Sequence, residues 1–144
     1  MDLAEVEEKS SYLKGWVKTI QIDVCDGQFV QNATWPYRKH DDFFEKIMKE
    51  EEGVPNWDAF DFEIDLMANR PEDLVDAWVS AGAARIIIHA EATGDVAAAI
   101  ANLEGRVEVG LALAMETPLS AIAPHREKIN FIQLMGIDNV GFQH

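Results

Sequence analysis

The sequence has 144 residues, 48% hydrophobic and 26% charged, a composition typical of one folded globular domain. Its 26 acidic and 12 basic residues give a net charge of −14, which argues against nucleic acid and anionic lipid as partners, because phosphate binding needs clustered Lys and Arg. The single cysteine, Cys25, excludes an internal disulfide, no apolar run reaches the ~20 residues of a membrane helix, and the acidic start is unlike a signal peptide. We therefore expect a soluble cytoplasmic protein without a membrane partner.

The first elements follow from the spacing of apolar residues. Residues 3–16 place apolar side chains near one face and glutamates on the other, which predicts a helix. Residues 19–25 alternate between apolar and polar side chains, which predicts a strand with one apolar face. A long loop follows over 26–39, and long ordered loops are more often functional than short ones.

The remaining elements alternate between helix and strand. The next helix begins at Asp41 or Asp42, either of which can cap it, and ends by Gly53, and residues 60–67 alternate strictly enough to predict a strand. The rest follows as helix 69–82, strand 85–91, helix 93–105, strand 107–114, short helix 117–125 and strand 129–137, with Asn69, Thr93 and Thr117 as expected helix caps.

Strands that alternate with helices pair in parallel through right-handed crossovers. Two architectures are open: a doubly wound sheet, whose central strands are apolar on both faces, and a (β/α)₈ barrel, whose inward face carries the active site near the carboxyl ends of the strands. The polar faces of strands 19–25 and 60–67 favour the barrel. Since a whole barrel usually has eight strands, we predict an α/β fold that is a partial TIM barrel of about five parallel strands, one incomplete domain over 1–144. The inward polar residues are Gln21, Asp23, Cys25, Glu63, Asp65, Met67, His89 and Glu91.

Five segments carry a family resemblance. Residues 21–32, QIDVCDGQFVQN, resemble the second-strand pattern H-I-D-V-M-D-G-x-F-V-P-N of the ribulose-phosphate 3-epimerase family. EIDLM at 63–67 and HAEA at 89–92 resemble its third and fourth strands, LAMETPL at 113–119 its fifth, and LMGIDNVGFQ at 134–143 its sixth. The resemblance implies a ribulose-phosphate-binding barrel that lacks the first strand and everything past the sixth, with free sheet edges that invite association.

The resemblance also implies a reaction. The family inverts a carbon next to a carbonyl in a pentulose 5-phosphate, using two carboxylates as acid and base and a divalent metal held by two His and two Asp. Asp23 matches the first of these Asp residues, so we predict that it is a general base and metal ligand; otherwise it is a hydrogen-bonded aspartate at a strand end. Gln21 and Asp65 stand at the two His positions, and these oxygen donors predict either a divalent metal, Mg²⁺, Mn²⁺ or Zn²⁺ with preference shifted toward the harder Mg²⁺ and Mn²⁺, or no metal.

Other positions match the substrate pocket of the family. Met67 and Met135 match methionines that line the pocket, and Cys25 stands in place of a third, although core packing explains all three equally well. Gly141 and Phe142 stand where the family binds substrate phosphate through backbone N–H groups.

Two polar pairs are interpreted from their positions. His89 and Glu91 are interpreted as an inward polar pair that supports the site, or His89 as a buried histidine whose hydrogen bonds are satisfied. Asp26 and Gly27 are interpreted as turn formers, since Asp and Gly favour turns.

The sequence thus predicts an epimerase-like chain that acts on a phosphorylated sugar and has little or no activity alone, because the second catalytic Asp of the family lies on a seventh strand. One alternative is a non-catalytic barrel fragment that acts as an oligomerisation or regulatory partner. Another is a related barrel enzyme for a different sugar phosphate.

Overall fold

The computed structural model describes residues 2–38 and 42–137 and shows one parallel sheet. The order of its strands, β1-β2-β3-β4-β5, follows the order of the chain. The strands are β1 Thr19–Cys25, β2 Asp61–Met67, β3 Ala83–His89, β4 Glu108–Leu113 and β5 Phe131–Leu134.

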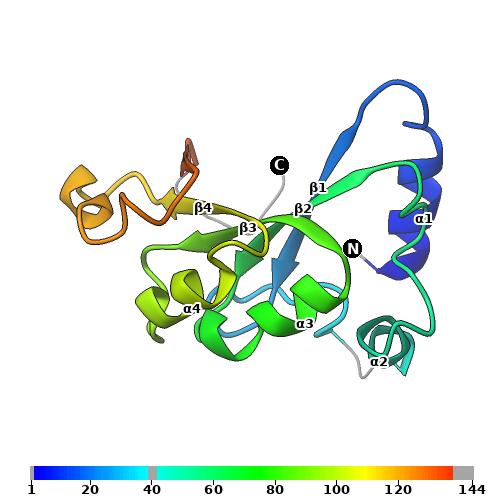
Figure 1. Ribbon diagram of the computed structural model, residues 1–144, viewed down its shortest axis with the longest axis horizontal. Helices are drawn as coiled ribbons and strands as arrows, with labels where there is room; N and C mark the ends of the chain where they lie inside the picture. The colour runs from blue at the N-terminus through cyan, green and yellow to red at the C-terminus, as the bar shows by residue number, and fades with distance from the viewer. Residues whose placement is uncertain (1, 39–41, 138–144) are drawn as a thin grey trace.

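This strand order distinguishes the two predicted architectures. In a doubly wound sheet the order reverses, so that helices cover both faces. Here the order never reverses, and right-handed crossovers then place every connecting helix on the same side, as in a (β/α)₈ barrel. In Figure 1, helices α3 (Val75–Ser80) and α4 (Val96–Leu103) lie together on one side of the sheet. The prediction of a partial TIM barrel is confirmed.

The helices are shorter than the sequence predicts, and two are of the 3₁₀ type. Helix α1 ends well before Trp16, and the predicted helix over 69–82 divides into a 3₁₀ turn and a short α-helix. The predicted helix over 117–125 is only a 3₁₀ turn. The helical elements are α1 Leu3–Ser11, α2 Asp42–Met48, η1 Pro71–Asp73, α3 Val75–Ser80, α4 Val96–Leu103 and η2 Leu119–Ile122.

Local chemistry explains several of these bounds. The Asp2 side chain accepts a hydrogen bond from the Glu5 backbone N–H, and Glu5 returns one to Asp2, so a capping box begins α1. Asp95 caps α4 by accepting from Ala98 N, so the expected cap at Thr93 is wrong. Asn69 is not a cap either, because η1 begins after Arg70, whose side chain makes no capping bond. Asp41 lies outside the described residues.

The apolar core lies between the sheet and its helices. Alternate strand residues on this side are closed to solvent, and Trp78 of α3 and Ile100 of α4 are fully buried against them. Burial of this face is what fixes the register, since a slip by one residue would turn it to the opposite side. The strand residues in the core are Ile22, Val24, Phe62, Ile64, Leu66, Ile86, Ile88, Val109, Leu111 and Leu113.

The outer face of β5 is an exception. Ile132 is 45% exposed and Leu134 68% exposed, because the short η2 leaves this part of the sheet uncovered. Nowhere in the described ranges is a helix both long enough and apolar enough to cross a membrane.

Candidate active site at the carboxyl ends of the strands

The face of the sheet opposite the core carries the polar residues that the sequence singled out. In the parallel register, Asp23 of β1 pairs with Asp65 of β2, and Cys25 pairs with Met67. Residues two apart on a strand point to the same face, so Gln21 belongs to this layer as well. The register therefore brings two carboxylates together near the carboxyl ends of neighbouring strands.

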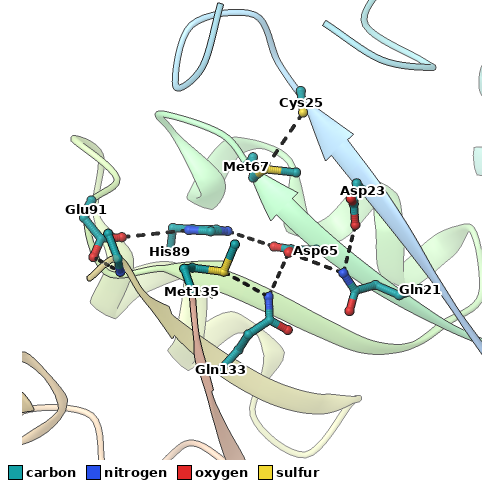
Figure 2. Close-up of polar contacts among 10 residues, drawn as sticks. Gln21, Asp23, Cys25, Asp65, Met67, His89, Glu91, Gln133 and Met135 are labelled. Carbon is teal, nitrogen blue, oxygen red and sulfur yellow. Dashed lines mark hydrogen bonds and ion pairs between the residues drawn. The ribbon is translucent and has the colours of Figure 1, made fainter. Parts of the chain in front are cut away.

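Asp65 lies at the centre of this cluster, with only 2% of its surface exposed. Its Oδ1 lies 2.8 Å from Nε2 of His89, and its Oδ2 accepts a 2.9 Å hydrogen bond from Nε2 of Gln133 (Figure 2). Gln21 donates a longer bond of 3.5 Å to the same Oδ2. A buried polar group needs hydrogen-bond partners, so these three contacts explain how Asp65 is accommodated.

Asp23 is joined to Asp65 through Gln21. The Nε2 atom of Gln21 donates a 2.8 Å hydrogen bond to Oδ1 of Asp23 and the 3.5 Å bond to Asp65 (Figure 2). Asp23 is half-buried, whereas Gln21 is exposed. One amide group therefore holds the two carboxylates side by side at the open face of the sheet.

His89 lies between two carboxylates. Its Nδ1 is 3.8 Å from Oε2 of Glu91, and both of these atoms are buried without a hydrogen-bond partner. The other oxygen of Glu91 accepts from the Ala114 backbone N–H at 2.8 Å and from the Thr117 hydroxyl, so the carboxylate is fixed in place. The ring of Phe29 packs against the imidazole with centroids 5.1 Å apart. The structure thus brings His89 and Glu91 together as expected, while their role stays a prediction.

The sulfur-containing side chains lie beside the carboxylates. Sγ of Cys25 is 4.0 Å from Sδ of Met67, and both residues are closed to solvent. Burial, followed by the charges of Asp23 and Asp65, raises the pKa of the Cys25 thiol to about 11. Met135 contacts the site through its sulfur, 3.4 Å from Nε2 of Gln133.

The predicted turn at Asp26 and Gly27 is confirmed. Oδ1 of Asp26 accepts from the backbone N–H groups of Gln28 and Phe29 at 2.7 and 2.8 Å, and Oδ2 accepts from that of Asn69 at 2.8 Å. Gly27 has φ of 77°, a left-handed conformation that glycine adopts without strain. Asp26 therefore fixes the loop after β1 against the end of β2.

Comparison with known proteins identifies the family. The model of the ribulose-phosphate 3 epimerase family matches residues 2–143. The chain belongs to this family. Ribulose-phosphate 3-epimerase from Treponema pallidum is 28% identical over 98% of the chain, and that from Schizosaccharomyces pombe is 32% identical over 95%. The enzyme of Chlamydia trachomatis is 30% identical over 82%. The chain covers 60%, 58% and 46% of the lengths of these relatives.

Gln133, which donates a hydrogen bond to Asp65, was not among the candidate residues that the sequence suggested. It lies in the predicted strand 129–137, two residues before Met135, and therefore on the same face. That spacing was a usable signal, but contact with Asp65 across the sheet follows only from the fold.

The divalent metal that the family resemblance implies does not fit the described residues. Within 2–38 and 42–137, no group of three or more His, Cys, Asp and Glu side chains is placed to hold a metal ion. Asp65 already accepts from Gln133 and Gln21 and contacts His89, and the amide N–H groups that face it repel a cation. The described residues thus give no support to Asp23, Asp65 and Gln21 as metal ligands. Gly141 and Phe142, predicted for phosphate binding, lie outside the described residues.

Proposed function

We propose that this chain carries the β1–β5 part of an epimerase site, in which Asp23 removes a proton from the carbon next to a carbonyl of a phosphorylated sugar. One observation carries the proposal. Gln21 holds the half-buried Asp23 beside Asp65 on the open face of the sheet, near the carboxyl ends of its strands. This is the position at which barrels of this class carry catalytic groups.

The chemistry needs a base and a means to stabilise the enediolate. A carboxylate can accept the proton if it lies within hydrogen-bond reach of the carbon that loses it. The negative charge that develops on the substrate oxygen must then be met by fixed N–H donors. The side-chain amides of Gln21 and Gln133 are on the same face as Asp23, and each already donates to Asp65, so an amide that met the substrate oxygen would exchange one of these bonds for it.

A pentulose 5-phosphate is the proposed substrate, because the family relatives are ribulose-phosphate 3-epimerases. Cys25, Met67 and Met135 are proposed to line the sugar pocket beside the carboxylates. Gly141 and Phe142 are proposed to contact the phosphate. A cytoplasmic location is part of the same proposal.

Net epimerisation needs a second acid or base on the opposite face of the sugar. The family resemblance assigns that role to a strand that the 144 residues do not include. We therefore expect the 144-residue polypeptide to bind ribulose 5-phosphate but to epimerise it poorly.

Two measurements test this proposal. Calorimetric titration with ribulose 5-phosphate should show saturable binding, and a coupled assay should show little net epimerisation. Asp23→Asn should abolish any residual turnover, whereas Asp61→Asn, at the exposed start of β2, should leave it unchanged. No binding of ribulose 5-phosphate would contradict the proposed substrate, and robust turnover would contradict the expected impairment.

A second candidate is an oligomerisation or regulatory partner without catalysis. The uncovered apolar side chains of β5, Ile132 and Leu134, favour it, because such residues on a sheet face or edge promote association. Light scattering after gel filtration tests it: association that Leu134→Glu removes would support this function, and a monomer at high concentration would count against it.

A further inference from the structure

The side chains of Asp65 and Asp23 in this cluster are contacted by side-chain nitrogen atoms. Both oxygens of the buried Asp65 face nitrogen atoms: Oδ1 faces His89, and Oδ2 faces the amides of Gln133 and Gln21. Oδ1 of Asp23 also accepts from Gln21. A metal ion at this position would need these oxygens and would lie against N–H groups that repel it.

The guanidinium group of Arg85, on the same face, is already engaged. Arg85 lies one layer below, where it pairs with Glu63 at 3.5 Å and also with Glu108. Its place in the register, opposite Glu63 and Glu108, keeps it toward the amino ends of the strands. The donors that compensate Asp65 are therefore the imidazole of His89 and the two amides.

We propose that Asp65 and its three nitrogen donors occupy the place that the family gives to a divalent metal, so that this site works without a metal ion. The substitution involves two positions together: Gln21 and Asp65 replace the two His of the family pattern, and His89 and Gln133 complete the new hydrogen-bonded cluster. In this arrangement His89 contacts Asp65, and Gln21 joins Asp65 to Asp23.

This inference deepens the proposed function and rests on it for the identity of the reaction. Its own test does not depend on that reaction, because metal binding is measured without turnover. A failed solvent-exchange or substrate-binding experiment therefore rejects the proposed reaction and leaves the metal result intact. Saturable metal binding rejects this inference and leaves Asp23 as a candidate base.

The test is calorimetric titration with Mn²⁺ and, separately, Zn²⁺ of four forms of the 144-residue chain. They are the wild type, Asp23→Asn, Asp61→Asn and Gln21→His/Asp65→His. Asp61→Asn serves as the matched control, because a chain of net charge −14 attracts cations weakly wherever carboxylates are exposed.

The expected result is that the wild type, Asp23→Asn and Asp61→Asn show the same weak, unsaturated heats. Gln21→His/Asp65→His should gain a one-to-one site for Zn²⁺, on the order of tenfold tighter or more, because imidazole suits Zn²⁺ whereas Mn²⁺ prefers oxygen ligands. Removing Asp23 in that background should abolish the gain. If circular dichroism shows that the double variant is unfolded, Gln21→His alone replaces it, since Gln21 is exposed.

A one-to-one wild-type site that is lost in Asp23→Asn but kept in Asp61→Asn would overturn the inference. Failure of the folded His variants to gain a site would also overturn it, because the cluster would then not lie where a metal can bind.

Discussion

The carboxylate of Asp65 and the imidazole of His89 form a buried pair, with Oδ1 and Nε2 2.8 Å apart and 2% and 0% of the two residues exposed. Asp65 lies opposite Ile87 in the register of β2 and β3, so the pair runs diagonally to the end of β3. It ties the two strands together on the side of the sheet that the helices do not cover.

Removing the imidazole should destabilise the fold. His89→Phe keeps a ring against Phe29 but leaves Oδ1 of Asp65 without its 2.8 Å partner, and a buried polar group left without a hydrogen bond costs about 1–3 kcal/mol. Urea unfolding followed by circular dichroism measures the change. Arg126→Ala is the control, because its ion pair with Glu127 is exposed and should contribute less than about 1 kcal/mol. Equal effects of the two substitutions would show that the buried pair contributes little.

The Cys25 thiol should react slowly. Burial, first, and the neighbouring charges of Asp23 and Asp65 raise its pKa from 9.0 to about 11, so little thiolate is present near neutral pH. A thiol reagent at pH 8 should modify the native chain slowly and the urea-unfolded chain rapidly. Rapid native modification would contradict the buried, protonated thiol.

The same shift predicts how stability changes at alkaline pH. Because the folded pKa is raised, the thiol contributes stability that is fully present below pH 9, and this contribution is lost as pH rises toward about 11. The loss should reach at most about 3 kcal/mol. Urea unfolding at intervals from pH 8 to pH 11 measures it, and Cys25→Ala should flatten the curve. Tyr37, whose pKa is raised to about 12 by burial, should keep its own later decline in both proteins.

Gly110 leaves room for an aromatic ring. A Cβ at this position would lie 2.6 Å from the Phe131 ring and 3.0 Å from Cγ1 of Ile87, so Gly110→Ala must displace the ring. Overpacking of this kind costs about 1–3 kcal/mol. Thermal or urea unfolding checks it against Gly136→Ala, where a Cβ meets no atom within 4 Å. If Gly110→Ala is as stable as that control, the ring moves without cost.

Asp26 should control the order of the loop after β1. Asp26→Ala removes the acceptor of three backbone N–H groups, those of Gln28, Phe29 and Asn69. We expect a loss of about 1–3 kcal/mol and faster hydrogen exchange at these three amides. Asp58→Ala, at an exposed position, should change neither quantity. Unchanged exchange in Asp26→Ala would show that the turn does not depend on this side chain.

The strands were more predictable than the helices. Strict alternation predicted the strand over 19–25 correctly and the strand over 60–67 to within one residue. Alternate residues of a strand point to opposite faces, so burial of one face produces an alternation of apolar and polar residues in the sequence. The helix over 69–82 was wrong in its extent because Pro71 and its neighbours form a 3₁₀ turn, and such turns share the start signals of α-helices. Asp95 replaced Thr93 as a cap for a similar reason, since both residue types can cap a helix and only the backbone decides between them.

The site was predictable in its members and less so in its connections. The alternation and the family resemblance together gave Gln21, Asp23, Asp65 and His89. They did not give the bond between Asp65 and His89, because the diagonal position of the two residues depends on the register of β2 and β3. Gln133 was missed because its spacing from Met135 places it on the polar face but does not reveal its contact with Asp65, which depends on the fold.

The most direct test of the central claim is exchange of the substrate proton with solvent. Ribulose 5-phosphate is incubated with the 144-residue chain in D₂O, and the hydrogen on the carbon next to the carbonyl is followed by proton NMR. Exchange needs only one base, so it does not require the second catalytic group. The account predicts exchange above the protein-free rate that is retained in Asp61→Asn and lost in Asp23→Asn. Exchange that is absent, or that persists unchanged in Asp23→Asn, would contradict the assignment of Asp23 as the base.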